Sequence, residues 1–220
     1  MRLLIAQYGG DYRKAFNLVR NEGIETYNSQ KYVIDTVTNI AKQIDEVILL
    51  CCNTKETYNQ EIEPGLRVIG AGVEPHTNSS KILEIIQESQ PTHLIIHFPM
   101  TDIFNWAIKH QVKMIGLFAD CFLPINWKQR IKNYNKAKIF NHEQVDWVAN
   151  HGLNACYSLQ KIGVNPNKII PWDWQHQTTP QKFDVKKLKP NSLPRKLAYV
   201  GLINDNKGVG DIITAVAKLQ

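Results

Sequence analysis

Short apolar runs alternate with longer amphipathic segments along most of this 220-residue chain, and this alternation restricts the fold more than any other feature. Such alternation is typical of βαβ units, in which parallel strands form a sheet and helices cover it. We therefore expect an α/β fold of Rossmann-like type, with a parallel sheet and helices on both faces. The apolar content of 43% is that of an ordinary globular protein.

The same pattern assigns the elements to residue ranges. Strands are predicted near 2–7, 46–51, 66–70, 93–98, 112–118, 146–150, 168–171 and 197–201. Helices are predicted near 29–43, 77–89, 100–110, 126–140, 152–162 and 208–219. The segment 55–65 is polar and rich in turn residues, so we expect a loop between the second and third strands.

One segment near the end of the chain has the composition of a linker. Residues 175–195 are polar and lysine-rich and contain three prolines. We therefore predict an N-terminal domain over 1–174, an interdomain linker over 175–195, and the first βα unit of a truncated second domain over 196–220.

The net charge of +6 suits an anionic partner or simply a solvated surface. Basic residues gather at 128–138 and 182–196, but aromatic residues do not interleave with them as on a single-strand-binding surface, so nucleic acid is not expected as a partner. The run 128–138, with Trp127 and Ile131, is compatible with peripheral contact to an anionic membrane. A solvated helix face is the alternative.

The four cysteines are Cys51, Cys52, Cys121 and Cys156, and no two form a C-x-x-C pair. This usage indicates buried, reduced thiols in a cytoplasmic protein and predicts no metal site. No apolar run approaches the length of a membrane span. We expect a cytoplasmic location, with membrane association as an open alternative.

Ligands of open α/β sheets bind beyond the carboxyl ends of the strands, because loops and helix N-termini converge there. Among the residues that the sequence places at these ends are Gly9, Gly10, His97, Asp120, Asn150, His151, Trp172 and Asp173. They predict one cleft lined by an imidazole or two, a carboxylate and glycines.

Each of these residues also has a purely structural interpretation. Gly9 and Gly10 either form a plain turn or let the backbone contact phosphates or an acceptor. His97 either hydrogen-bonds within the core or binds a sugar or phosphate. Asp120 either holds an acceptor hydroxyl or caps a loop.

The same holds for the last two strand ends before the linker. Asn150 either caps the following helix or contacts the acceptor or sugar. Trp172 and Asp173 either stack on a sugar ring and hydrogen-bond its hydroxyls or pack at the interdomain hinge.

The end of the chain, 196–220, reads as a strand, a glycine turn, a polar loop with Lys207, and a helix that begins at Gly208. The first turn of a helix presents unpaired N–H groups and the positive end of the helix dipole, which suit a phosphate. Lys207 would neutralise a diphosphate, and a solvated lysine is the alternative.

Three segments carry a resemblance to the retaining "group 1" family of GT-B glycosyltransferases. Residues 93–99 resemble its V-H-V-H-x-P segment, with His97 on the second histidine. Residues 159–169 resemble L-x-x-x-G-V-x-x-x-K-I, and 200–208 resemble V-G-R-L followed by S-P-E-K-G. The usual histidine after the fifth strand is replaced by Ala119, and the arginine of V-G-R-L by Leu202.

The resemblance implies transfer of a sugar from a nucleotide-sugar to an acceptor hydroxyl, with retention and without a metal or other cofactor. His97 and Asp120 would be catalytic, and Gly9, Gly10, Lys207 and Gly208 would bind the phosphates of the donor. Asn150, Trp172 and Asp173 would contact the acceptor or sugar. The acceptor could be a polysaccharide, a lipid or a small molecule.

The family's E-x7-E motif has no counterpart before the chain ends, so the chain is expected to be nearly inactive alone. Two alternatives remain open at this point. One is a non-catalytic Rossmann-like binding module, and the other is a GT-B enzyme of different chemistry, an epimerase or a phosphorylase.

Overall fold

The structure is a computed structural model that describes residues 1–26, 30–173, 180–184, 197–201, 203 and 207–218. Contacts divide the chain into two compact units, Met1–Gln177 and Thr178–Gln220. The division falls within 175–195, the segment predicted as a linker, most of which lies outside the described residues. Each unit is described by itself below.

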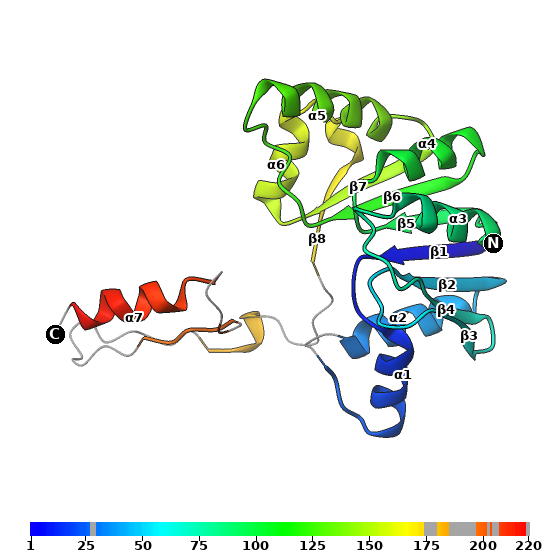
Figure 1. The fold of residues 1–220 in the computed structure, drawn as a ribbon, viewed down its shortest axis with the longest axis horizontal. Helices are drawn as coiled ribbons and strands as arrows, with labels where there is room; N and C mark the ends of the chain where they lie inside the picture. Colours follow the sequence, from blue (N-terminus) through cyan, green and yellow to red (C-terminus); the bar gives the residue numbers. More distant parts are fainter. Residues whose placement is uncertain (27–29, 174–179, 185–196, 202, 204–206, 219–220) are drawn as a thin grey trace. The chain divides into compact units, whose positions relative to one another are not determined.

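The first unit alternates strands and helices, as the apolar pattern predicts (Figure 1). Its strands are β1 (Arg2–Gln7), β2 (Glu46–Cys51), β3 (Tyr58–Glu63), β4 (Leu66–Gly70), β5 (His93–Ile96), β6 (Lys113–Phe118), β7 (Val145–His151) and β8 (Ile169–Trp172). Its helices are α1 (Tyr12–Asn21), α2 (Gln30–Ala41), α3 (Ser79–Ser89), α4 (Thr101–Lys109), α5 (Trp127–Phe140) and α6 (Leu153–Lys161), with a short 3₁₀ helix at Pro166–Lys168.

All eight strands form one sheet, in the order β3-β4-β2-β1-β5-β6-β7-β8. Every neighbouring pair is parallel except β3 with β4. The chain first adds strands on one side of β1 and then on the other, so the order reverses between β1 and β5. The fold is therefore α/β and Rossmann-like, and the carboxyl ends of β1 and β5–β8 lie at the same edge.

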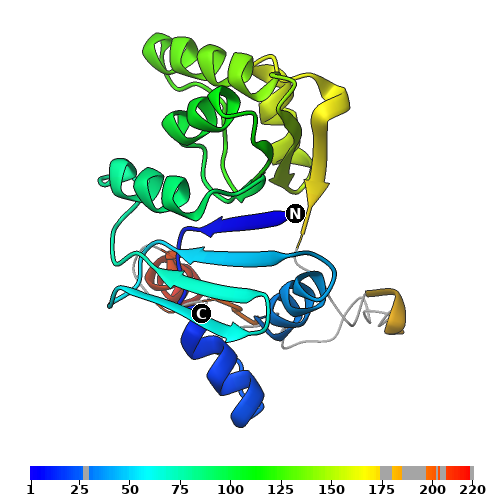
Figure 2. The same cartoon turned by 90° about the vertical axis from the view of Figure 1, so that its right-hand side faces the viewer.

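Helices cover both faces of the sheet, as expected (Figure 2). Leu3 and Ile5 of β1 face a core cluster with α1 and α2, whereas Leu4 and Ala6 face a cluster with α3, α4, α5 and α6. The alternation of side chains along a strand sends neighbours to opposite faces, which explains why β1 is apolar at almost every position.

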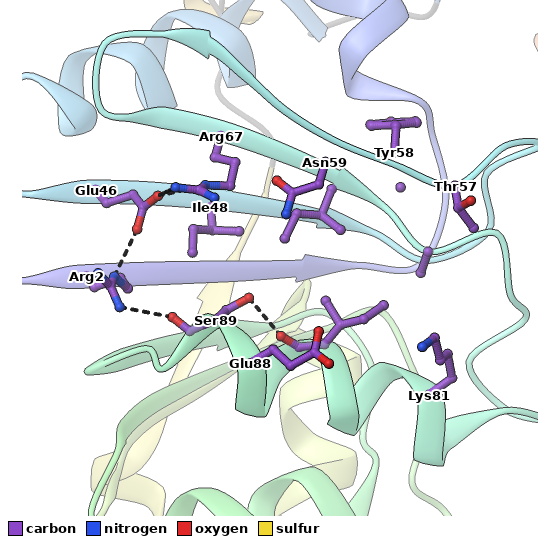
Figure 3. Close-up of a pocket in the computed structure, with 14 residues that line it drawn as sticks. Arg2, Glu46, Ile48, Thr57, Tyr58, Asn59, Arg67, Lys81, Glu88 and Ser89 are labelled. Atoms are coloured by element: carbon purple, nitrogen blue, oxygen red, sulfur yellow. Dashed lines mark hydrogen bonds and ion pairs between the residues drawn. The ribbon is translucent and has the colours of Figure 1, made fainter.

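The loop predicted over 55–65 is wrong, because Tyr58–Glu63 forms β3, an antiparallel edge strand. Three of its six residues are exposed and the others are only partly buried, so its sequence is largely polar and lacks the apolar run of a buried strand. Between β2, β4 and α3 lies a groove of about 530 Å³ (Figure 3). Glu46 pairs there with Arg2 and Arg67, and none of the predicted site residues lines it.

Helix α1 has no counterpart among the predicted helices. Asp11 caps it, since its side chain accepts a hydrogen bond from the backbone N–H of Lys14 at 3.2 Å. Tyr12, Phe16 and Val19 are buried at helical spacing. The Tyr58 hydroxyl donates to Asp11 Oδ1 at 2.8 Å and so ties β3 to the start of α1.

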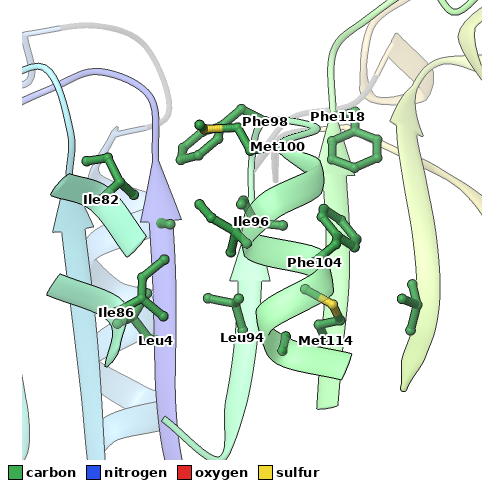
Figure 4. Packing of buried hydrophobic residues seen from close by; sticks show 14 of the residues in the cluster. Leu4, Ile82, Ile86, Leu94, Ile96, Phe98, Met100, Phe104, Met114 and Phe118 are labelled. Carbon is green, nitrogen blue, oxygen red and sulfur yellow. The ribbon is translucent and has the colours of Figure 1, made fainter. Parts of the chain in front are cut away.

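The core on the face of α3–α6 is continuous and rich in aromatic rings (Figure 4). Phe104, Phe118 and Phe140 are fully or almost fully buried, with ring centroids 5.2–6.2 Å apart.

Of the cysteines, Cys51, Cys52 and Cys156 are buried free thiols, whereas Cys121 is exposed. Burial was therefore predicted correctly for three of the four.

In the second unit, α7 (Val209–Ala217) confirms the predicted helix, but the strand predicted near 197–201 is wrong. Residues 197–200 have no regular structure, and Val200 is 94% exposed. A strand is stabilised by hydrogen bonds to a neighbouring strand, and no described strand pairs with this segment.

Among the helices of the described residues, none combines the length and apolarity of a membrane span.

Candidate functional site

A pocket of about 460 Å³ opens at the carboxyl edge of the sheet. The residues that line it are Gln7, Tyr8, Gly9, Gly10, His97, Leu117, Ala119, His151 and Trp172. They come from the ends of β1, β5, β6, β7 and β8 and the turns that follow, where the order of the strands predicts a binding site. Gly9, Gly10, His97 and Trp172 were predicted to share this place.

His97 follows β5 and continues its pairing, since its backbone N–H donates to the carbonyl of Ala6 at 3.0 Å. Its ring lies edge-on to Trp172, with centroids 5.9 Å apart. A second cavity, of about 230 Å³ and bordered by Val33 and Val37 of α2, shares His97 and Trp172 as lining residues. The imidazole therefore lies in largely apolar surroundings.

Burial lowers the pKa of His97 to about 4. The imidazole is neutral at pH 7 as a result, with one nitrogen that donates and one that accepts a hydrogen bond. Such a group suits a hydroxyl better than a phosphate. Its low basicity also makes it a poor proton acceptor.

The neutral state of His97 predicts a pH dependence of stability. Between pH 6.5 and 4 the unfolded chain protonates this imidazole while the folded protein does not, so the free energy of unfolding falls as pH falls through that window. We expect a loss of about 2 kcal/mol, less than the full shift implies because the ring is only partly buried. Urea unfolding at pH 7 and pH 4.5 measures it.

The control is His97→Asn, which cannot titrate in this range. The variant should lose about 2 kcal/mol less than the parent between the two pH values, since all other groups are shared. Equal losses in both proteins would show that His97 titrates normally in the folded state.

His151, at the end of β7, forms the opposite wall of the pocket. Its Nε2 lies 2.8 Å from Asp173 Oδ1, and its ring lies edge-on to Trp172 at 5.6 Å. The Trp172 indole N–H donates to the carbonyl of Phe118 at 2.8 Å, which ties the indole to the end of β6, the strand between β5 and β7. Asp173 thus reaches the pocket through His151, a residue that the strand-end rule selects but that had no assigned role.

Asn150 supports the pocket from behind. It is fully buried, and its amide donates to the carbonyls of Asp120 and Ala155 at 2.9 and 3.1 Å while its oxygen accepts from the Asp120 N–H at 3.2 Å. A direct contact of Asn150 with an acceptor would require this loop to open. Asp120 is exposed on that loop and next to the pocket wall, which Ala119 forms.

The Gly9–Gly10 turn forms the floor of the pocket entrance. Gly10 has φ +94°, a conformation that favours glycine, whereas a Cβ at Gly9 would meet nothing within 4 Å. The backbone at Gly9 is therefore open to close approach by a ligand. Beside it, the Tyr8 hydroxyl donates to Glu74 Oε2 at 2.7 Å, a contact that the sequence did not indicate.

Lys207 and Gly208 belong to the second unit. Gly208 precedes α7 with φ +67°, and its carbonyl accepts from the N–H of Ile212 at 3.1 Å. Lys207 is exposed immediately before it. The phosphate site at this helix start stays a prediction.

Among the described residues that line the pocket there is no lysine, arginine or carboxylate. It offers instead two imidazoles, an amide, a phenol, an indole and an open backbone. Among the residues that the structure describes, no group of three His, Cys, Asp or Glu side chains could hold a metal ion. The described lining therefore combines groups that can donate or accept hydrogen bonds with the apolar face of an indole.

Comparison with models of known protein families gives no match, and comparison with curated proteins gives no significant match. The likeness to glycosyltransferases therefore depends on the residues quoted above alone.

Proposed function

We propose that the chain binds sugars as the acceptor-side part of a glycosyltransferase that uses a nucleotide-sugar donor. The observation that carries the proposal is the pocket lining, in which His97, His151 and Trp172 surround an open glycine turn. Hydroxyl groups of a sugar match the imidazoles and the Gln7 amide, and the apolar face of a sugar ring matches the indole.

In this proposal His97 hydrogen-bonds a sugar hydroxyl as a neutral imidazole and orients it. His151, held by Asp173, offers a second polar contact across the pocket. A hydroxyl held next to the anomeric carbon has already lost its freedom of translation and rotation. This lowers the barrier to transfer. Retention at that carbon is implied by the family resemblance and is tested by the anomeric configuration of the product.

A donor diphosphate needs cations or N–H groups, and among the described residues that line the pocket the Gly9–Gly10 backbone is our candidate to supply them. Within the second unit, taken by itself, Lys207 and the start of α7 stay candidates for binding the phosphates of a nucleotide. Leu202, at the position of the family's arginine, leaves this donor site with one cation fewer than the family pattern implies.

The test is NMR titration of the ¹⁵N-labelled chain, read at the indole N–H signals. Methyl glycosides and UDP-, GDP- and dTDP-sugars are the probes, and UDP alone is the control ligand. We expect at least one sugar to shift the Trp172 signal, assigned with Trp172→Phe, and to leave the exposed Trp127 unchanged. If no glycoside or nucleotide-sugar shifts Trp172, or if UDP alone does so equally, the sugar site is wrong.

A further inference from the structure

Helix α5 has a buried stripe that packs on the core and a second, apolar stripe that is exposed. Asn133, Ala137 and Phe140 are buried, at spacings of four and three residues. The second stripe is formed by Trp127, Ile131 and Tyr134, which have the same spacing and therefore lie on one face of the helix. They are 67%, 54% and 57% exposed.

The loop before α5 adds two more exposed apolar side chains. Leu123 is 47% exposed and Ile125 is 89% exposed. The loop is nevertheless firmly anchored at Phe122, which is buried. The N–H of Phe122 donates to Ser158 Oγ at 3.1 Å, and its carbonyl accepts from the amide of Asn133. The structure therefore presents these side chains from a fixed loop.

Helix α6, to which Ser158 belongs, repeats the pattern at the same end of the unit (Figure 1). Leu153 and Tyr157 lie one turn apart and are 76% and 52% exposed. The Lys161 ammonium lies 4.8 Å from the centre of the Tyr157 ring. On α5, the Lys138 ammonium lies equally close to Tyr134 at 4.8 Å.

The loop and α5 are basic in sequence, with the exposed Asp120 directly before the loop, where it attracts Lys136. Residues 121–141 contain five basic residues and no acidic one. The basic residues are Lys128, Arg130, Lys132, Lys136 and Lys138. We call the exposed apolar residues of the 121–126 loop, α5 and α6, together with these basic residues, the basic–apolar face.

We propose that the basic–apolar face docks on the surface of an anionic lipid bilayer. Tryptophan and tyrosine favour the depth of the lipid headgroups, and lysine chains can extend past them to the phosphates. Aliphatic side chains such as Ile125 insert into the acyl boundary, and each nearby cation adds attraction to anionic lipid. A nucleic acid would satisfy the cations but would leave Leu123, Ile125 and Ile131 in water.

This inference is independent of the sugar site, because no residue of the basic–apolar face lines the pocket. The sequence analysis found only that the basic run 128–138 is compatible with contact to a membrane. The structure adds the side chains that would insert into it. The side chains that the basic run alone does not indicate are those of Leu123, Ile125, Tyr134, Leu153 and Tyr157.

The test is co-sedimentation of the full chain with vesicles of phosphatidylcholine, with and without phosphatidylglycerol. We expect binding to the anionic vesicles that decreases with added salt. Ile131→Glu should lower the partition coefficient roughly tenfold, since it places a charge in the inserting stripe. The matched control is Ile24→Glu, because Ile24 is 52% exposed and lies outside this face.

A second pair of variants tests the electrostatic part. Lys128→Gln combined with Arg130→Gln and Lys132→Gln should weaken binding to anionic vesicles only, whereas Gln at Lys42, Lys55 and Lys109 should have little effect. Circular dichroism confirms that each variant is folded. The proposal is overturned if the parent does not bind anionic vesicles, if Ile24→Glu weakens binding as much as Ile131→Glu, or if single-stranded RNA binds this face and prevents sedimentation.

Discussion

His97→Ala should lower the affinity for the sugar found by titration at least tenfold, which corresponds to about 1.4 kcal/mol. The variant removes a neutral imidazole that lies between two cavities and leaves the backbone pairing with Ala6 in place. In the proposed complex the variant would lose the hydrogen bond from His97 to a sugar hydroxyl and would leave that hydroxyl without a partner. Isothermal titration calorimetry of both proteins with the same sugar measures the change.

Two further variants separate the possible roles of this side chain. His97→Asn keeps a neutral donor and acceptor, so it should recover part of the lost affinity. His110→Ala removes an exposed histidine at the end of α4 and is the control for general effects of the substitution. Unchanged affinity in His97→Ala, with the fold intact, would remove His97 from the site.

Phe140→Ala should reduce the free energy of unfolding by about 4 kcal/mol, the largest effect on stability that we expect from one substitution. Phe140 is 1% exposed, and its ring lies 5.2 Å from Phe104 and 5.3 Å from Phe118. Alanine would remove most of these contacts and leave a cavity at the base of α5. Urea unfolding followed by circular dichroism measures the loss.

Phe140→Leu is the matched control for volume, and its loss should stay near 1.5 kcal/mol because most of the space is refilled. Ile24→Ala, at an exposed position, should change stability by less than about 0.5 kcal/mol. A loss below about 1 kcal/mol in Phe140→Ala would mean that the aromatic cluster is not closely packed.

The strands of the sheet could be predicted where they are buried on both faces. Ile48 and Leu49 of β2, for instance, contact opposite core clusters, so the strand reads as one apolar run. The edge strand β3 gives no such run because it is polar and exposed. The segment 197–201 has the apolar run of a strand but does not form one, and no described strand pairs with it. An apolar run therefore predicts a strand only where a neighbouring strand can pair with it.

The candidate site was predicted in part for the same reason. Gly10, His97 and Trp172 are found by the rule that ligands bind at strand ends, which needs only the positions of the strands. The pair of His151 with Asp173 and the contact of Tyr8 with Glu74 join residues from different segments. No local pattern encodes such pairs, so they required the structure.

The position of β1 has a consequence for how the protein is made. Leu3 pairs with Val47 on one side and with His93 on the other. During synthesis β1 therefore has to pair with two segments made at different times, and its pairing is complete only after β5 has been synthesised. Contacts between such distant segments slow folding and favour misassembly. The interval between the synthesis of β1 and that of β5 is therefore the period in which mispairing of β1 is most favoured.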